Sequence, residues 1–340
     1  MSKDYDKHML RERAERAPDI TDEMWSQVSE HNRMIVDEFF ESSSHLSKTS
    51  ISQYKSALRI FFWWVHVKLK DKPMYNIKKR DFLKYVSHLK DKGFSSSGLK
   101  LKKSAVSSLC NFIENVLSDD EEFKEYEKFR NFCRGLPAQS SNVVYEKIPM
   151  TREEYDKVME YLKEKEDYLG MAFHATSFNV GGRRNEIRNL KSEIATYENE
   201  KDSEGNELPF VLSHIVYGKG RDGGKPLKFM INNEAMEYIR LWLEQRRYEN
   251  EYIFTVKYAG NNSQIGLSWA NNFCQNIVSI VLDRRFTMHN YKASAITHLL
   301  EQGVDMKAVS KYVAHHENSA TTEKFYDLRS DEEEKNSIFK

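Results

Sequence analysis

Residues 181–190 read Gly181-Gly182-Arg183-Arg184-Asn185-Glu186-Ile187-Arg188-Asn189-Leu190, and this motif is the starting point for predicting the fold. The paired glycines permit a tight backbone turn, and a helix following them would place Glu186 and Leu190 on one face. Arg183, at the start of that helix, combines a two-pronged guanidinium with a helix N-terminus, and both features suit a phosphate group. The alternative interpretation of Arg183 is a structural salt bridge, which the sequence alone leaves open.

The second half of the chain carries further residues with chemical potential. Lys219 lies between two glycines at a predicted hairpin tip. It could be a lysine that only increases solubility, or its ammonium could be free to move into a site. His-Asn-Tyr-Lys occupies residues 289–292, and the adjacent His315 and His316 precede the pair Phe325-Tyr326. Taken alone, Tyr326 could be a packing aromatic and the histidines could cap a helix C-terminus. The order and spacing of these motifs therefore decide between the interpretations.

In that order, the motifs resemble the tyrosine recombinase, or phage integrase, family. The family signature Gly-x-Arg-x-x-Glu-x-x-x-Leu falls on residues 181–190, and the family's hairpin lysine falls on Lys219. The His-x-x-Arg box falls on residues 289–292. The family's second histidine falls on His315 or His316, and its nucleophile falls on Tyr326. The helix predicted at 47–64 is similar to part of the family's N-terminal core-binding domain.

The resemblance implies a chemistry that breaks a DNA phosphodiester with no metal and no small-molecule cofactor. Tyr326 would be the nucleophile and would store the bond energy as a 3′-phosphotyrosyl ester. Arg183 would clamp the phosphate, Lys219 would protonate the 5′-oxygen leaving group, and the histidines would supply supporting donors. The implied catalytic positions are Arg183, Lys219, His289, Lys292, His315, His316 and Tyr326.

The chain departs from the family at Lys292, where the second family arginine is expected. Lysine keeps the charge but loses the rigid fork, and the loss of one such transition-state interaction costs about 2–4 kcal/mol. Smaller departures are Ala293, where many members have a further histidine, and the sequence Val-Ala-His-His at 313–316 in place of Leu-Gly-His. These departures predict crippled cleavage with surviving phosphate binding.

The departures favour a sequence-specific DNA-binding protein with a tyrosine recombinase fold and impaired or lost strand exchange. Such a protein would act as a phage or prophage transcriptional regulator, similar to the recombinase-like lysogeny repressors of SPβ-type phages. The alternative is an active site-specific recombinase or integrase that forms the covalent tyrosine link. Double-stranded DNA is the expected partner in both cases, and the resemblance implies possible self-association through the acidic C-terminal tail.

The charge distribution agrees with a polyanionic partner, although 52 basic residues balance 52 acidic ones overall. Residues 47–117 hold 15 basic and 4 acidic residues, a balance of +11. Such a stretch could neutralise DNA phosphates, or it could simply form solvated helix faces. The predicted DNA-binding cations are Lys48, Lys55, Arg59, Lys78, Lys79, Arg80, Lys100, Lys102, Lys103, Arg184 and Lys225.

Several other classes of protein are not expected. The longest apolar run, 60–67, is too short for a membrane helix, and the charged segment 1–16 lacks the apolar core of a secretory signal. Cys110, Cys133 and Cys274 fit neither a disulfide framework nor a zinc spacing, and no carboxylate pattern completes a metal site around the histidines. We expect a phage- or prophage-encoded protein in the bacterial cytoplasm, acting at the host nucleoid.

The predicted fold class is mainly α with a small antiparallel β-sheet (α+β), and the resemblance implies a two-domain clamp. The predicted organisation is an N-terminal extension at 1–20, a helical core-binding domain at 21–134, a linker at 135–149, a catalytic-type domain at 150–328 and an acidic tail at 329–340. In the first domain, helices are predicted at 25–40, from Ser47 or Thr49 onward, at 78–90, and after the serine-rich stretch 95–98.

In the second domain, Thr151 and Glu154 have the spacing of a capping box that opens a helix. Two short β-rich runs, 210–217 and 226–231, predict a hairpin with a mobile tip at 218–224. Further helices are predicted at 234–247, 269–282, 289–302, 306–313 and 322–326. The second domain is therefore expected to be mixed, with few strands and many helices.

Overall fold

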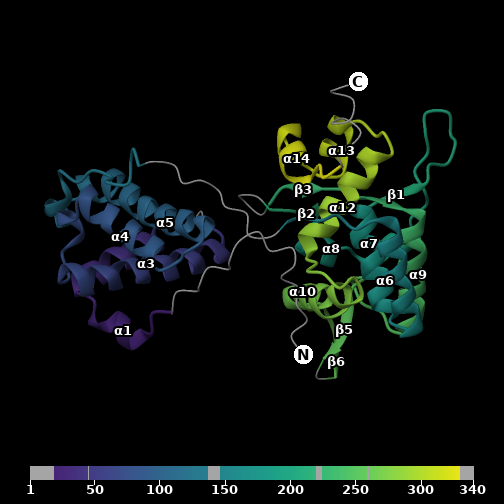
Figure 1. Ribbon diagram of the computed structural model, residues 1–340, viewed down its shortest axis with the longest axis horizontal. Coiled ribbons are helices and arrows are strands. Elements are labelled where there is room, and N and C mark those ends of the chain that lie inside the picture. Colours follow the sequence, from purple (N-terminus) through teal and green to yellow (C-terminus); the bar gives the residue numbers. More distant parts are fainter. Residues whose placement is uncertain (1–18, 45, 137–145, 220–223, 259, 330–340) are drawn as a thin grey trace. The chain divides into compact units, whose positions relative to one another are not determined.

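The computed structural model describes residues 19–44, 46–136, 146–219, 224–258 and 260–329. The chain divides into two compact units, whose described parts are 19–136 and 146–329. We call them the N-terminal unit and the C-terminal unit, and each is described by itself (Figure 1). The predicted segment 1–20 and the acidic tail fall largely outside the described residues.

The N-terminal unit is helical. Its helices are α1(Asp22–Gln27), α2(Glu30–Glu41), α3(Lys48–Leu69), α4(Lys79–Asp91) and α5(Ser96–Asn115), with 3-10 turns η2(Met74–Asn76), η3(Leu117–Asp119) and η4(Glu121–Tyr126). Ser47 and Ser95 cap α3 and α5 through their hydroxyls, which accept from the backbone N–H groups three residues on. The helix α3 packs on α5, and both bury apolar faces in an aromatic-rich core that includes Phe61, Phe62 and Tyr85.

The helix predicted at 25–40 is wrong in one respect, because the chain forms two helices there. The backbone is extended at Val28 and Ser29, between α1 and α2. The N–H of Ser29 donates to Asp71 Oδ1 (3.1 Å), and Arg33 Nε donates to the carbonyl of Val28 (3.0 Å). Side chains therefore satisfy the backbone groups at the break. One of these side chains is distant in the sequence, so a local pattern does not reveal it.

The C-terminal unit also consists mostly of helices. They are α6(Arg152–Glu164), α7(Tyr168–Val180), α8(Arg184–Arg188), α9(Asn233–Gln245), α10(Leu267–Phe273), α11(Ser279–Val281), α12(Met288–Glu301), α13(Met306–Tyr312) and α14(Ser319–Tyr326), with the 3-10 turn η5(Ser192–Thr196) and the π-helical turn η6(Cys274–Val278). The helix predicted at 269–282 thus contains a π-helical turn. The capping box of Thr151 and Glu154 is confirmed at the start of α6, since each residue's side chain accepts from the other's N–H (3.1 and 3.2 Å).

The helix α7 is the central element of this unit and was not predicted. It packs against α6, α9 and α12, as Figure 1 shows, and most of its residues are buried. Because it is apolar on every side, it lacks the one-sided periodicity by which helices are recognised in a sequence. Asp167 caps its N-terminus, and the carboxylate of Asp167 accepts from the N–H of Gly170 (2.8 Å).

A buried histidine joins three of these helices. His174 on α7 is fully buried, its Nε2 donates to the carbonyl of Tyr155 on α6 (3.1 Å), and its Nδ1 accepts from the hydroxyl of Tyr291 on α12 (2.6 Å). Burial lowers the pKa of His174 to about 3, so the ring is neutral at pH 7. This bond network fixes α12, the helix that carries two of the predicted catalytic residues, against the core.

The strands form small antiparallel ladders. The strands are β1(Phe210–Leu212), β2(Val216–Tyr217), β3(Pro226–Leu227), β4(Met230–Asn232), β5(Thr255–Tyr258) and β6(Asn261–Gln264), and β1 pairs with β4, β2 with β3, and β5 with β6. The predicted hairpin is present but interrupted, because Ser213 Oγ accepts the backbone N–H of Phe229 between the two ladders (2.9 Å). Residues 220–223 of its tip lie outside the described residues, and the β5–β6 hairpin was not predicted.

The predicted fold class is confirmed, since the chain is mainly helical with small antiparallel sheets. Within the described ranges, no helix is both long and apolar enough to cross a membrane.

Candidate functional site

The junction between α7 and α8 positions Arg183. Gly181 ends α7 with a φ of +64°, a conformation that favours glycine. A Cβ atom added to Gly181 would lie 2.9 Å from the Cβ of Ala295 on α12, so the two helices approach closely only because the side chain is absent. The sequence therefore turns sharply here and delivers Arg183 at the start of α8.

A buried carboxylate holds Arg183 in place. Glu186 accepts from the backbone N–H of Arg183 (2.7 Å) and from its guanidinium nitrogen Nη1 (2.9 Å), and Glu186 is only 1% exposed. The Arg183 side chain remains 35% exposed. The salt bridge considered as a structural alternative is thus present, and it leaves much of the guanidinium open to solvent.

Arg183 opens onto a cleft of about 340 Å³. The cleft is lined by Arg183, Lys219, Lys225, Leu227, His315, His316, Glu317, Asn318 and Thr321. It gathers four of the predicted catalytic residues and one predicted DNA-binding lysine from the α7–α8 junction, the β2–β3 hairpin and the loop before α14. The excess of cations in this cleft suits an anion. Lys225 also forms an ion pair with Glu317 (3.7 Å).

Lys292 does not line this cleft. Its side chain is buried, and its Nζ donates to the carbonyl of Ala314 (2.8 Å), immediately before His315. Burial, and next the charge of Arg183, lower the pKa of Lys292 to about 8. The ammonium is therefore bonded to the backbone of the loop that carries His315 and His316.

His315 has an unusual backbone and an unpaired ring nitrogen. Its φ is +54°, in the left-handed region, and its ring meets Phe229 edge to face at 4.9 Å. Within the described part of the chain, its Nε2 is buried without a hydrogen-bond partner. Burial, and next the charge of Lys292, lower the pKa of His315 to about 4. A neutral ring with a free nitrogen is thus held at the cleft.

His316 is bonded within the C-terminal helices. Thr322 Oγ1 donates to Ser310 Oγ (2.9 Å), so the Nδ1 of His316 must donate to Thr322 Oγ1 (2.9 Å). Nε2 is then the acceptor of the neutral ring. Burial, followed by the charge of Lys292, lowers the pKa of His316 to about 4. Both candidates for the family histidine therefore lie at the cleft, but only His316 is tied to α14.

Tyr326 ends α14 and faces the cationic side of the site. Its ring centroid lies 5.2 Å from that of His316, 5.8 Å from Lys292 Nζ and 5.1 Å from Lys147 Nζ. Its backbone carbonyl accepts from Thr297 Oγ1 on α12 (3.0 Å). The neighbouring Phe325 is 48% exposed, whereas Tyr326 is half-buried, so Tyr326 is the aromatic residue that packs into the site.

His289 lies near this group at the start of α12. Its side chain is exposed, yet its pKa is lowered, first by the partial desolvation of its ring and then by the charges of four cations. These are Lys147, Arg183, Arg184 and Lys292. His289 does not line the cleft of Arg183, but it shares the same positive surroundings.

Comparisons with known proteins agree with this geometry. Residues 149–332 match the phage integrase family, and residues 36–115 match the phage integrase N-terminal SAM-like domain. Over 340 residues the chain is 53% identical to the SPbeta prophage-derived recombinase-like protein YomM of Bacillus subtilis (strain 168), covering 100% of both chains. The chain belongs to the phage integrase family.

The chain is also similar to two proteins that are more distant in sequence. The chain is 23% identical over 275 residues to tyrosine recombinase XerA of Pyrococcus horikoshii, covering 81% of this chain and 82% of that one. A crystal structure of the XerH site-specific recombinase bound to palindromic difH substrate in a post-cleavage complex matches with a TM-score of 0.64 at 16% identity. That match covers 96% of this chain and 98% of the other, so the likeness of fold includes both units.

The predicted DNA-binding cations of this phage integrase family member lie mostly in the N-terminal unit. Lys48, Lys55 and Arg59 are on α3, residues 78–80 are at the start of α4, and Lys100, Lys102 and Lys103 are in the first half of α5. Some of them interact with other residues of the unit. Arg59 pairs with Asp22 (2.7 Å), Lys79 donates to the carbonyl of Arg134 (2.8 Å), and Lys102 Nζ lies 4.7 Å from the ring centroid of Phe94.

Two features of the site were not predicted from the sequence. One is the hydroxyl pair Ser310 and Thr322 beneath His316, and the other is Lys147, which lay within the predicted linker. No local signal identifies them, because their partners are distant in the sequence. Among the described residues, no group of three or more His, Cys, Asp or Glu side chains could hold a metal ion.

Proposed function

We propose that this chain binds double-stranded DNA in a sequence-specific way, with strand exchange impaired or lost, and regulates phage or prophage transcription as a lysogeny repressor. Membership of the phage integrase family and the 53% identity to a prophage recombinase-like protein support a phage-related role. The XerH structure of similar fold is bound to its difH substrate, and a Tn1549 transposon integrase structure of similar fold is in complex with transposon right end DNA, which supports DNA as the partner. The protein would act in the cytoplasm of its bacterial host.

The observation that carries this proposal is the environment of Lys292. A transition state for phosphoryl transfer gains from donors aimed at the phosphate oxygens. The Lys292 ammonium is buried, donates to the carbonyl of Ala314 and is not among the residues lining the cleft. A point charge directed at a carbonyl cannot replace a planar fork directed at a phosphate. Cleavage would then lose roughly two to three decades in rate, the usual effect of one missing donor.

Binding of DNA does not require the missing fork. The cleft offers Arg183, Lys219 and Lys225 to a phosphate, and His315 and His316 offer neutral rings that can accept a proton when an anion arrives. Phosphate contacts of this kind supply affinity, whereas base contacts supply sequence preference. The basic helices of the N-terminal unit would supply further phosphate contacts.

An active site-specific recombinase is the second candidate, and the position of Tyr326 favours it. The ring is retained beside His316, Lys147 and Lys292, on the same helix that closes the cleft with Thr321. A tyrosine that had become a packing residue would not need these polar neighbours. The two candidates differ in one product, a covalent bond between Tyr326 and DNA.

A transcription experiment tests the regulator. The full-length protein would first select its binding site from a library of host and phage genome fragments. Promoters carrying the selected site would then drive a reporter in cells. We expect repression by the wild-type chain and by Tyr326→Phe, and loss of repression by Arg183→Gln. Repression that required Tyr326 would contradict the regulator.

A binding experiment tests the contribution of the N-terminal unit. Replacing Lys100, Lys102 and Lys103 together by Glu should weaken binding to the selected DNA. It should also lower the slope of log affinity against log salt, by about 0.9 for each DNA phosphate that the variant no longer neutralises. An affinity that is unchanged at several salt concentrations would reject this face as a DNA-binding surface.

A further inference from the structure

Lys147 is a cation of the site that the family pattern does not include. It is the second described residue of the C-terminal unit and precedes α6. Its Nζ donates to the backbone carbonyl of Phe325 (3.1 Å) and lies 5.1 Å from the ring centroid of Tyr326. One side chain therefore reaches both the end of α14 and the ring of its last residue.

The chemistry of both contacts is favourable. The last carbonyls of a helix have no partner within the helix, and the C-terminal end carries partial negative charge. A lysine donating to the carbonyl of Phe325 satisfies one such group and places a positive charge at the favourable end. A cation near an aromatic ring adds an attraction to the ring quadrupole. Both contacts hold the end of α14 in one place.

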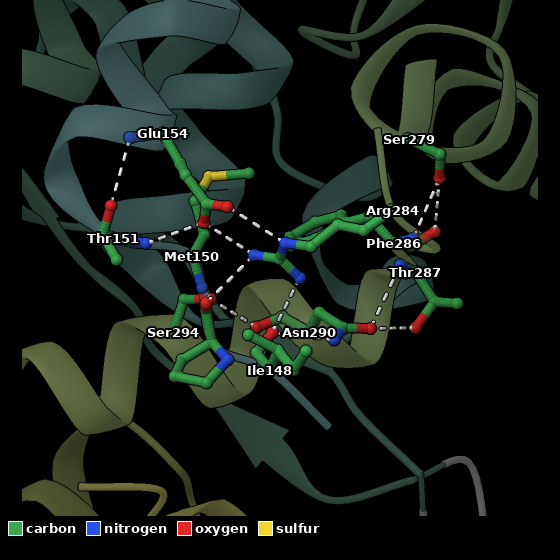
Figure 2. Close-up of polar contacts among 11 residues, drawn as sticks. Ile148, Met150, Thr151, Glu154, Ser279, Arg284, Phe286, Thr287, Asn290 and Ser294 are labelled. Carbon is green, nitrogen blue, oxygen red and sulfur yellow. Dashed lines mark hydrogen bonds and ion pairs between the residues drawn. The ribbon is translucent and has the colours of Figure 1, made fainter. Parts of the chain in front are cut away.

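The backbone next to Lys147 is fixed by a buried arginine, as Figure 2 shows. Arg284, 5% exposed, donates to the carbonyls of Ile148 (3.1 Å) and Pro149 (3.0 Å) and pairs with both oxygens of Glu154 (2.6 and 3.0 Å). Asn290 on α12 donates its Nδ2 to the same carbonyl of Ile148 (3.1 Å). Lys147 thus extends from a backbone that is bonded to α12 and to the capping box of α6.

Two further bonds complete this attachment. The N–H of Met150 donates to Ser294 Oγ (2.7 Å), and that hydroxyl donates to the carbonyl of Asn290 one turn earlier on α12 (2.7 Å). The strap formed by residues 147–150 is therefore fastened to the helix that carries His289 and Lys292. The reach of Lys147 toward α14 is set by bonds independent of α14 itself.

The charge of Lys147 also acts on the site. After desolvation, Lys147 is the largest of the cationic influences that lower the pKa of His289. Lys292, whose Nζ lies 5.8 Å from the same ring centroid of Tyr326, is buried and bonded to Ala314. Lys147 is instead an exposed residue, and its Nζ lies 5.1 Å from the ring centroid of Tyr326.

We propose that Lys147 is a positioning residue for Tyr326: it fastens the end of α14 to the strap 147–150 and keeps an exposed positive charge beside the ring. This proposal concerns the same site as the proposed function. It rests on the proposed function in one respect only, that Tyr326 matters to the site.

The test uses the full-length protein without DNA and three variants. Lys147→Gln removes the charge, and Lys147→Arg retains it. Lys165→Gln is the matched control, since the Nζ of Lys165 lies 5.8 Å from the ring centroid of Tyr161, a lysine–tyrosine pair outside the site. Fluorotyrosine labelling gives a resonance for Tyr326, assigned by its absence in Tyr326→Phe. Hydrogen exchange reports on the amides of α14.

In Lys147→Gln we expect the Tyr326 resonance to shift and the α14 amides to exchange roughly threefold to tenfold faster, the effect of removing one hydrogen bond. The pKa of His289, followed by NMR titration, should rise because a cation that disfavours its protonated form has gone. Lys147→Arg should restore all three readouts, and Lys165→Gln should change none.

A Tyr326 resonance and α14 exchange that are unchanged in Lys147→Gln would overturn the proposal. A change in exchange that Lys147→Arg fails to restore would also overturn it, because the charge would then not matter. These readouts need no DNA. Detection of recombinase activity would therefore contradict the proposed function while leaving this result standing.

Discussion

Two parts of the site each carry one cation, the junction of α7 with α8 and the first turns of α12. The two cations differ in how far they are exposed. Arg183 is held by the buried carboxylate of Glu186, yet about a third of its side chain stays exposed at the cleft. Lys292 has equal formal charge but is buried, and its ammonium donates to the carbonyl of Ala314. Equal formal charge at two predicted site positions therefore does not mean equal availability to a ligand.

The first and largest expected effect is on DNA affinity. Arg183→Gln should lower affinity for the selected DNA about tenfold to a hundredfold, the effect of losing a hydrogen bond to a charged group. Lys292→Met should leave affinity little changed, because Lys292 does not line the cleft. Fluorescence anisotropy at several salt concentrations measures both. Equal losses in the two variants would break the comparison.

Arg183→Lys sharpens the same measurement. It keeps the charge and removes the fork, which is the same change that we predicted at position 292 from the resemblance. We expect an affinity between those of the wild type and Arg183→Gln, with thermal unfolding confirming that each variant is folded. An affinity equal to the wild type would show that the fork is unimportant for binding at this cleft.

The second effect is on stability, and it isolates Lys292. Burial lowers its pKa from 10.5 to about 8 in the folded chain. Between these values the unfolded chain binds a proton that the folded chain has released, so the contribution of Lys292 to the free energy of unfolding rises with pH. The difference in unfolding free energy between wild type and Lys292→Met should rise by up to about 3 kcal/mol from pH 8 to 10.5.

Chemical denaturation at closely spaced pH values measures this difference. Taking the difference cancels the titration of the buried tyrosines and cysteines, which both proteins share. Lys165→Met is the control, because this lysine is exposed, and its difference from wild type should stay flat. A flat difference for Lys292→Met would mean that the ammonium is not buried in solution.

The smallest expected effect concerns the pH dependence of binding. His315 has a pKa of about 4 in the free chain and is neutral at pH 7. A phosphate in the cleft favours the protonated ring, so binding takes up a proton and affinity should rise as the pH falls from 7 to 5. His315→Gln should make this rise in affinity smaller. The size of that change should be severalfold less than the loss of affinity in Arg183→Gln. His298→Gln, which changes a histidine outside the cleft, should leave the rise in affinity intact. An unaltered pH profile in His315→Gln would remove this histidine from the phosphate site.

Much of the fold was predictable where the determining contacts are local. The cap at Ser47 and the capping box at Thr151 depend on residues three apart, so the sequence reveals them directly. The spacing of Arg183 and Glu186 likewise predicts a shared helix start. The break between α1 and α2 was not predictable, because Asp71 supplies one of its bonds from a distant position. The helix α7 was missed because burial on all sides removes its periodicity.

The site residues also separate into those that the sequence predicts and those that depend on distant contacts. Motif order predicted Arg183, Lys219, His315, His316 and Tyr326 as site residues. The structure brings the first four of them to one cleft, and their catalytic roles stay predictions. The burial of Lys292 depends on the carbonyl of Ala314, and the role of Lys147 depends on α14, which is far along the chain. Such interactions arise from tertiary packing, so no spacing rule reveals them.

The central claim is that withdrawal of the Lys292 ammonium leaves phosphate binding without cleavage. The most direct measurement incubates the full-length protein with a nicked suicide duplex carrying the selected site and looks for a covalent adduct by denaturing electrophoresis. We expect no adduct for the wild type, and an adduct for Lys292→Arg that disappears in the double variant with Tyr326→Phe. A wild-type adduct that depends on Tyr326 would show that the Lys292 ammonium does not prevent cleavage and would identify an active recombinase.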